Sequence, residues 1–172
     1  WVMNLFHRGA ASAERLQEIL GATPAVDDSR AMDGLNVDRG EIRFDQVSFR
    51  YPDSTGAVLE QISFDLPAGK TLGIVGATAS GKTTLLNLIP RLPPTVSGQI
   101  FVDGHPIEKY TLDELRSSIA MVPQEPFLFS ATIAENIAFG DADASMDEIE
   151  KVARLVRIED EICKFPDLYD QR

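Results

Sequence analysis

The chain has 172 residues, of which 27 are acidic and 16 basic, so its formal net charge is −11. A hydrophobic share of 44% and a length close to that of one domain are typical of a folded globular protein and exclude a disordered chain. The acidic balance argues against nucleic-acid binding, because phosphate backbones are neutralised by basic patches. Residues 66–130 carry five basic and five acidic groups, so bulk charge opposes an anionic ligand least in this segment.

The remaining composition limits the class of protein further. The single cysteine, Cys163, excludes an internal disulfide and a cysteine-based metal cluster. No apolar run approaches the roughly 20 residues that span a bilayer, and no secretory signal is visible. The chain begins with Trp1, without an initiator methionine. We therefore expect a cytosolic piece of a longer polypeptide.

Three kinds of pattern follow one another in the first part of the chain. Residues 1–20 repeat apolar side chains at three- and four-residue steps, which predicts a helix. Residues 21–40 contain glycine, proline and four aspartates without a period, which predicts a linker. Residues 42–51 alternate in two opposite phases, which predicts a strand with a bulge near Asp45 and Gln46. A second alternating strand is predicted to end at Leu66.

Strands and helices alternate in the rest of the chain. Residues 71–75 and 119–122 are short continuous apolar runs, typical of strands buried on both faces. A helix is predicted over residues 81–89 and a strand over residues 99–102. Three Ser/Thr-x-x-Glu capping boxes, at Thr111, Thr132 and Ser145, predict the starts of further helices. Antiparallel strands followed by strand–helix alternation predict a mixed α/β fold.

One segment carries a chemical motif. Residues 76–83, GATASGKT, fit the phosphate-binding pattern G-x4-G-K-[ST] between a predicted strand and a predicted helix. A glycine-rich turn lets backbone N–H groups converge on phosphate, and the helix adds the positive end of its dipole. Lys82 supplies a charge for the terminal phosphates, and the Thr83 hydroxyl is placed to ligate Mg²⁺. The predicted binding residues are Gly76, Thr78, Ala79, Ser80, Gly81, Lys82 and Thr83.

Four segments resemble the nucleotide-binding domain of ATP-binding cassette (ABC) transporters of the exporter type. They are VSFRYP at 47–52, GATASGKTTLLNLIPRL at 76–92, SGQIFVDG at 97–104 and MVPQEPFLFSATIAENIAFG at 121–140. The resemblance implies an α/β P-loop NTPase fold of the ABC type, with an N-terminal antiparallel β-subdomain and a partial parallel core. It also implies that this chain binds ATP with Mg²⁺ and, within the complete transporter, couples ATP binding and hydrolysis to export.

The resemblance divides the chain into three parts. Residues 1–20 resemble the cytoplasmic end of the last transmembrane helix, and residues 21–40 the linker that follows it. Residues 41–172 resemble a nucleotide-binding domain truncated at its C-terminus. The implied partners are a second nucleotide-binding domain and the transmembrane domain of the same transporter, not nucleic acid. The implied location is the cytoplasmic face of the cell membrane.

The resemblance also implies roles for single residues. Tyr51 is similar to the aromatic residue that stacks on adenine, although its pattern alone favours a packing role. Thr84 resembles a second hydroxyl that contacts the phosphates. Gln124 resembles the glutamine that meets Mg²⁺ and responds to the membrane domain, so it is a predicted catalytic residue together with Lys82.

Some family features differ or are missing in this sequence. Ala79 stands where the family usually has glycine, and at a positive φ an alanine costs on the order of 1–2 kcal/mol, which predicts weaker nucleotide binding. Leu168 also replaces a common glycine. The hydrolytic acidic pair, an LSGGQ-type loop and the family histidine do not occur, and Asp103 precedes a Gly104–His105 turn instead. We therefore expect background-level ATP hydrolysis from this fragment.

Two alternatives remain at the level of sequence. One is a small stand-alone P-loop kinase in which Asp103 or Glu125 acts as an acid. The other is a regulatory module that binds ATP without turnover. The truncation implied by the resemblance also predicts that residues 72–75 and 119–122 have exposed strand edges, which is an aggregation liability.

Overall fold

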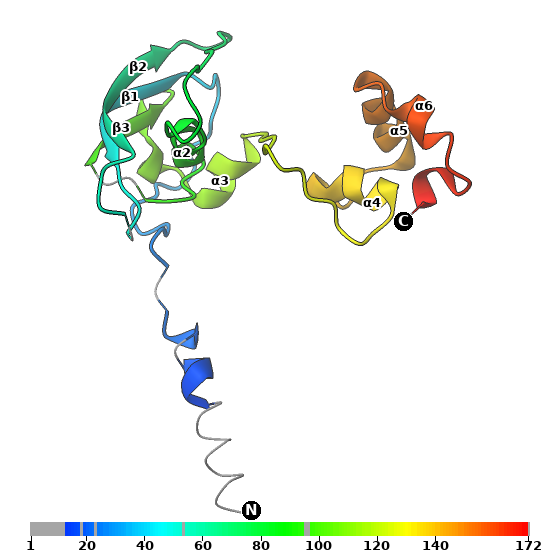
Figure 1. Cartoon of the computed structure of the whole chain (residues 1–172), viewed down its shortest axis with the longest axis horizontal. Coiled ribbons are helices and arrows are strands. Elements are labelled where there is room, and N and C mark those ends of the chain that lie inside the picture. The colour runs from blue at the N-terminus through cyan, green and yellow to red at the C-terminus, as the bar shows by residue number, and fades with distance from the viewer. Residues whose placement is uncertain (1–12, 18, 23, 53, 95–96, 172) are drawn as a thin grey trace, which may run out of the picture. The chain divides into compact units, whose positions relative to one another are not determined.

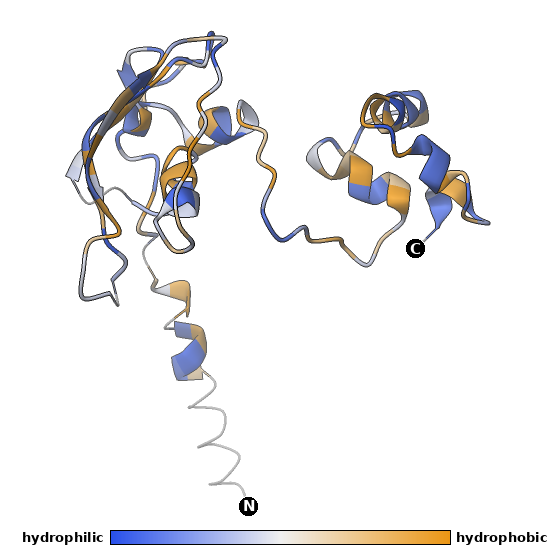
Figure 2. Cartoon of the chain, turned by 45° about the horizontal axis from the view of Figure 1, so that its top comes forward, coloured by the Kyte–Doolittle hydropathy of each residue, from blue (hydrophilic) through white to orange (hydrophobic). Residues whose placement is uncertain are grey.

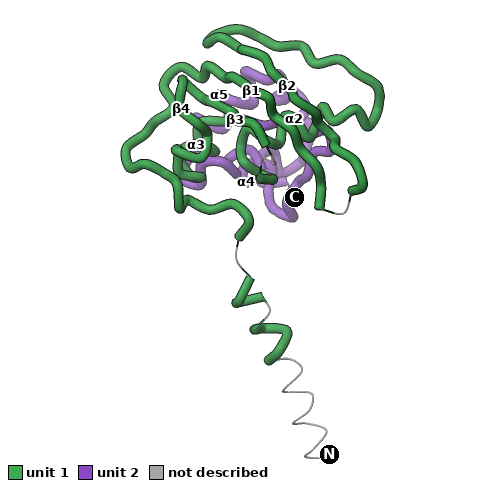
Figure 3. The backbone as a smooth tube through the Cα atoms, turned by 90° about the vertical axis from the view of Figure 1, so that its left-hand side faces the viewer, with its two compact units in different colours: residues 1–120 green, residues 121–172 purple. Residues whose placement is uncertain are grey.

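The computed structural model describes residues 13–17, 19–22, 24–52, 54–94 and 97–171. The chain divides into two compact units, Trp1–Ala120 and Met121–Arg172, coloured green and purple in Figure 3. Residues 13–17 and 19–20 are helical, which confirms that part of the helix predicted over residues 1–20. The predicted residues 1–12 and 18 lie outside the described part of the chain. None of the described helices has the length and hydropathy needed to cross a bilayer.

The first unit contains an antiparallel sheet in the order β2-β1-β3-β4, of which the first three strands are labelled in Figure 1. Its strands are β1 (Ile42–Phe49), β2 (Leu59–Leu66), β3 (Ser97–Val102) and β4 (His105–Pro106). The predicted bulge is confirmed, because the β1–β2 register shifts between Phe44 and Val47 and Gln46 has a φ of 52°. Gly98 fits beside this bulge, since a Cβ atom on Gly98 would lie 2.3 Å from the carbonyl oxygen of Gln46.

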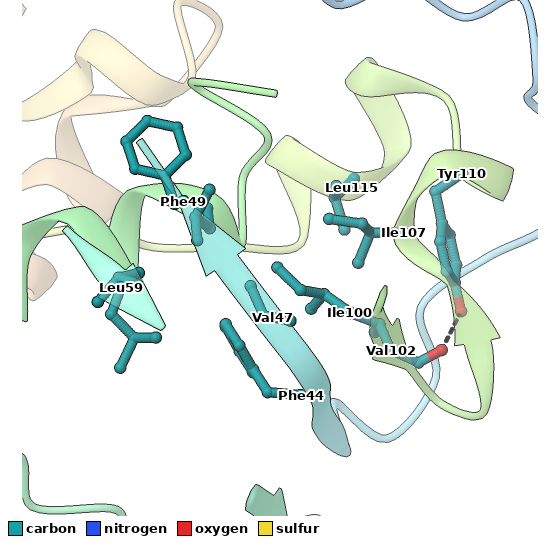
Figure 4. Close-up of a cluster of buried hydrophobic side chains, with 11 residues drawn as sticks. Phe44, Val47, Phe49, Leu59, Ile100, Val102, Ile107, Tyr110 and Leu115 are labelled. Carbon is teal, nitrogen blue, oxygen red and sulfur yellow. Dashed lines mark hydrogen bonds between the residues drawn. The ribbon is translucent and has the colours of Figure 1, made fainter. Parts of the chain in front are cut away.

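Helical segments cover one face of this sheet and close its core. They are α2 (Lys82–Leu88), the 3₁₀ turn η1 (Ile107–Lys109) and α3 (Leu112–Ser117). Side chains from both layers are fully buried, among them Val47, Leu88, Ile100 and Tyr110. The Tyr110 hydroxyl donates a hydrogen bond to the carbonyl oxygen of Val102 at 2.8 Å (Figure 4), so its one polar atom is satisfied inside the core.

The second unit is helical. It consists of α4 (Ile133–Ile137), η2 (Ala138–Gly140), α5 (Met146–Leu155), α6 (Glu159–Ile162) and η3 (Leu168–Asp170). Complete capping boxes at Thr132 and Ser145 start α4 and α5, as predicted, and the Thr111 side chain caps α3 in the first unit. A small core of its own unites α5, α6 and η3 through Ile149, Ala153, Ile162 and Tyr169.

The two predicted buried strands are absent from the described residues, so this prediction was wrong. Residues 71–75 and 119–122 form no strand, and Figure 2 shows that parts of the coil are hydrophobic. Val75 is 98% exposed and Val122 is 94% exposed. A central strand is stable only when a neighbour pairs with its N–H and C=O groups, and no described strand pairs with either segment. The antiparallel β-subdomain is thus observed, while the described residues contain no parallel strand pair.

Candidate functional site

The glycine-rich loop lies in the first unit, between β2 and α2, and its backbone depends on two glycines. Gly81 caps α2 with a φ of 86°, and a Cβ atom there would lie 3.0 Å from Leu59 Cδ2 and 3.1 Å from the carbonyl oxygen of Val58. A Cβ atom on Gly76 would lie 2.6 Å from Ser80 Oγ. Glycine is therefore required at residue 81, where φ is positive and backbone lies close, and at residue 76 it keeps the chain clear of the Ser80 hydroxyl.

Lys82 folds back into this loop. Its Nζ donates hydrogen bonds to the carbonyl oxygens of Gly76 at 2.9 Å and Ala77 at 2.7 Å, and it lies 3.3 Å from Ser80 Oγ. No side chain caps the N-terminus of α2. The first N–H groups of a helix have no partner within it, so these groups and the Lys82 ammonium form a positive site that suits an anion.

The other predicted loop residues lie in the same short stretch. Residues 76–80, which include Thr78, Ala79 and Ser80, are exposed, as is Thr83 at the start of α2. Ala79 has a φ of 64°, so the left-handed conformation that the sequence argument requires is present at this alanine.

Tyr51 and Thr84 come together beside the loop. The Tyr51 and Thr84 hydroxyl oxygens lie 3.1 Å apart, although the two residues are 33 positions apart in the sequence. Thr84 is buried in α2, whereas Tyr51 is 42% exposed. The Tyr51 and Phe49 rings form a T-shaped pair with 4.8 Å between the ring centroids. Tyr51 is thus held by the Phe49 ring and by its own hydroxyl, and its exposed part is available to a ligand.

Gln124 and Glu125 belong to the second unit, where both are exposed. The predicted contact of Gln124 with Mg²⁺ therefore stays a prediction. No cluster of three or more His, Cys, Asp or Glu side chains suited to a metal occurs among the described residues. A magnesium ion in the phosphate loop would instead be held by hydroxyl, amide and phosphate oxygens.

Asp103 has a structural role that the sequence did not predict. Its carboxylate accepts hydrogen bonds from the backbone N–H groups of residues 38–41, at distances of 2.8–3.3 Å. Burial raises the pKa of this carboxyl, but the four hydrogen bonds outweigh burial and lower the pKa to about 2. Asp103 is therefore ionised near neutral pH and already occupied, so the geometry contradicts a role as the acid of a small kinase. An aspartate directly before a glycine, after a strand, predicts a turn at this position but not the bonds of Asp103 to residues 38–41.

The antiparallel subdomain, together with a glycine-rich loop, its lysine and the helix behind it, defines a nucleotide-binding protein of the P-loop class. A family profile described as "ABC transporter" matches residues 59–168. This match covers more than half of the chain, and the chain belongs to the ABC transporter family.

Individual relatives agree with this assignment. The multidrug resistance-like ATP-binding protein MdlA of Escherichia coli is 41% identical over 170 residues, which is 99% of this chain and 28% of MdlA. The ATP-dependent lipid A-core flippase of Aliivibrio fischeri is 40% identical over 96% of this chain and 28% of the flippase. The solved structure of a bacterial Atm1-family ABC exporter with ATP bound superposes with a TM-score of 0.89 at 33% identity, over 96% of this chain and 29% of the exporter chain.

These comparisons confirm the resemblance to ABC exporters. This chain spans less than a third of the length of the relatives that it matches. The ABC ATPase family implies nucleotide binding, and the phosphate loop is the part of the described chain whose geometry suits it.

Proposed function

We propose that this chain is the ATP-binding part of an ABC exporter, which couples ATP binding and hydrolysis in the whole protein to export across a membrane. The observation that carries the proposal is the phosphate loop, in which Lys82 Nζ lies within 2.9 Å of two loop carbonyl oxygens, ahead of an uncapped helix. Family membership supports the same reading, because the matched relatives include ATP-dependent exporters.

The triphosphate binds in the loop. The backbone N–H groups of the loop residues surround the phosphates, and Lys82 turns from its loop carbonyls to the terminal phosphate oxygens. The loop suits this group, because residues 76–80 are exposed and the Lys82 ammonium lies beside them. The contacting residues are Gly76, Thr78, Ala79, Ser80, Gly81, Lys82, Thr83 and Thr84.

Mg²⁺ and the adenine complete the site. The Thr83 hydroxyl would hold Mg²⁺, which when bound neutralises charge on the phosphate oxygens, and the resemblance to the family implies Gln124 as a further ligand. The exposed ring of Tyr51 stacks on the adenine. Thr84 keeps the Tyr51 hydroxyl in place and contacts the phosphates from the first turn of α2.

The partners are a second nucleotide-binding domain and the transmembrane domain of the same transporter, at the cytoplasmic face of the membrane. By the family resemblance, residues 1–20 correspond to the end of the last transmembrane helix, residues 21–40 to the linker, and residues 41–172 to part of the nucleotide-binding domain. Gln124 relays the state of the nucleotide to the membrane domain. The relatives named as a flippase and as an ABC exporter support the transmembrane partner.

Catalysis needs more than this sequence contains. The water that attacks the terminal phosphate requires a glutamate after a Mg²⁺-binding aspartate, and no such acidic pair follows an apolar strand in the 172 residues. Lys82 and Gln124 stabilise and orient the phosphates, but neither side chain accepts the proton of water at neutral pH. This chain therefore binds ATP without hydrolysing it above background.

Fluorescence titration with a labelled ATP analogue in the presence of Mg²⁺, beside a phosphate-release assay, tests the proposal. We expect saturable binding, background phosphate release and at least tenfold weaker binding by Lys82→Ala, because one charge-assisted contact is worth about 1.5–3 kcal/mol. Lys70→Ala is the matched control, since Lys70 is an exposed lysine of the same unit. Absence of binding by the unmodified chain, or equal binding by Lys82→Ala, would contradict the proposed site.

A further inference from the structure

A buried arginine joins the end of the phosphate-loop helix to the segment that precedes the sheet. Arg91 lies three residues beyond α2, and its backbone N–H donates to the carbonyl oxygen of Leu88 at 3.1 Å. The Arg91 side chain is 9% exposed. Its guanidinium donates to the carbonyl oxygen of Asp27 at 2.7 Å and to that of Tyr110 at 3.3 Å. Arg91 thus binds a segment 64 residues away in the sequence.

Asp28 makes a second connection from the same segment. Its Oδ1 lies 3.9 Å from Arg91 Nη1 and accepts a hydrogen bond of 2.8 Å from the backbone N–H of Leu112, the first residue of α3. The backbone N–H of Met32 donates to the carbonyl oxygen of Lys109 at 2.8 Å. Residues 27–32 are therefore attached both to the end of α2 and to the start of α3.

Hydrogen bonds from Arg116 restrain the backbone at Arg91 in an unusual conformation. Arg91 has a φ of 52°, in the left-handed region that residues with a Cβ atom rarely adopt. The Arg116 guanidinium donates to the carbonyl oxygens of Pro90 at 3.0 Å and Arg91 at 3.1 Å. Strained backbone persists where its surroundings fix it, and a buried charge adds less stability than an apolar side chain of similar size. Both features favour a positioning role for Arg91 over simple packing.

We propose that Arg91 and Asp28 form a latch that transmits a nucleotide-dependent shift of α2 to residues 27–32. This inference rests on the proposed function, because it takes the phosphate loop as the nucleotide site. One end of α2 carries Lys82 and the other leads into Arg91, while the buried side chains of Leu85 and Leu88 make this short helix move as one body. When bound phosphate attracts Lys82 at the start of α2, the whole helix shifts. Arg91 and residues 27–32, which are bonded to it, shift with the helix.

Amide hydrogen exchange of the full 172-residue chain, followed by NMR with and without Mg²⁺ and the slowly hydrolysed analogue ATPγS, tests the latch. The reporters are the backbone N–H groups of Met32 and Leu112, which bond across the joined segments. The affinity for ATPγS is measured separately, by its displacement of a fluorescently labelled ATP analogue. We expect bound analogue to change the exchange rates of both amides by about threefold or more, as coupling between sites requires.

Arg91→Lys is the decisive variant. Lysine keeps the charge but lacks the planar fork that reaches the Asp27 carbonyl, the Tyr110 carbonyl and the Asp28 carboxylate together. We expect this variant to bind the analogue within about threefold of the unmodified chain and to lose the exchange response at both reporters. Arg30→Lys is the matched control, because Arg30 is an exposed arginine that lines the same cavity as Arg91, and it should keep the full response.

A second variant covers the case in which Arg91→Lys does not fold. Asp28→Asn keeps an oxygen that accepts the Leu112 N–H but removes the charge that faces Arg91, so the response should fall to less than about half. Analogue binding without any change at Met32 and Leu112, or a full response in a folded Arg91→Lys or in Asp28→Asn, overturns the latch and leaves the proposed function standing. No analogue binding by the unmodified chain overturns the proposed function and the latch together.

Discussion

The Tyr51 and Thr84 hydroxyl oxygens lie 3.1 Å apart and connect the end of the first strand to the helix that follows the phosphate loop. Each group restrains the other, because Thr84 is buried and the Tyr51 ring forms a T-shaped pair with Phe49. The contact therefore fixes the exposed Tyr51 ring at a constant position relative to the loop. A ring held in this way provides a stacking surface without the entropy loss of ordering a free side chain.

Substitutions at Tyr51 separate the ring from its hydroxyl. Tyr51→Phe removes one hydrogen bond and should lower the free energy of unfolding by about 0.5–1.5 kcal/mol while changing ATP affinity by less than about threefold. Tyr51→Ala removes the stacking surface and should weaken ATP binding by about tenfold or more. Calorimetric titration with ATP and with inorganic triphosphate checks this, since only ATP offers a base. Equal losses for both ligands in Tyr51→Ala would show that the ring does not contact the adenine.

Ala79→Gly relieves a strained position in the phosphate loop. Ala79 has a φ of 64°, a conformation that costs an alanine about 1–2 kcal/mol relative to glycine. We expect the glycine variant to bind ATP more tightly, by about three- to tenfold, because the loop then adopts its binding conformation at a lower energy. Titration of both proteins with a fluorescent ATP analogue measures the difference. Identical affinities would contradict the prediction that Ala79 weakens nucleotide binding.

The hydrogen bonds between the Asp103 carboxylate and the N–H groups of residues 38–41 make the stability of the fold depend on pH in the acid range. The pKa of Asp103 in the folded chain is about 2, below the ordinary value of 3.8, so the carboxylate stabilises the fold fully above pH 4 and loses this contribution as the pH falls from about 4 to about 2. Since Asp103 is partly exposed, we expect a contribution of about 1–2 kcal/mol. Urea unfolding between pH 2 and pH 6 measures it.

Asp103→Asn is the comparison for this titration. The amide keeps one acceptor oxygen for the N–H groups of residues 38–41 but does not ionise. The variant should be less stable than the unmodified chain at pH 6 and nearly equal to it at pH 2. A constant stability difference across this pH range would assign the loss to packing and not to the charge.

Features with a local cause could be predicted from the sequence. The bulge at Gln46 follows from two opposite phases of alternation within one strand, and the caps at Thr132 and Ser145 follow from residues three positions apart. The phosphate loop is likewise a contiguous pattern, and the positive φ of Ala79 agrees with the argument made for a glycine position.

Features that depend on partners far away in the sequence could not be predicted from it. Asp103 bonds to residues 38–41, more than 60 positions away, and Arg91 bonds to Asp27 across a similar separation. Nothing in either neighbourhood specifies these pairs. The runs at 71–75 and 119–122 show the same limit, because apolar composition indicates a preference for burial but does not supply the neighbouring strands that a buried strand needs.

Asn136 determines the backbone of the loop before α4. Its Oδ1 accepts the backbone N–H of Phe129 at 2.8 Å, and its Nδ2 donates to the carbonyl oxygens of Phe129 at 3.2 Å and Thr132 at 2.9 Å. The held loop stacks the Phe129 ring on Phe139, with 4.4 Å between the centroids. Asn136→Ala leaves these groups without their partner and should lower the free energy of unfolding by about 1–3 kcal/mol.

Asn136→Asp separates the hydrogen bond that Asn136 accepts from those that it donates. The aspartate still accepts the Phe129 N–H but cannot donate to the carbonyl oxygens, and it places a negative charge beside them. We expect fast exchange of the Phe129 amide and a weaker near-ultraviolet circular dichroism signal in Asn136→Ala. In Asn136→Asp, Phe129 amide protection should be retained in part while the fold is still destabilised. If Asn136→Ala keeps full protection of this amide, the side chain does not hold the loop, and the stack of Phe129 on Phe139 is sufficient to order it.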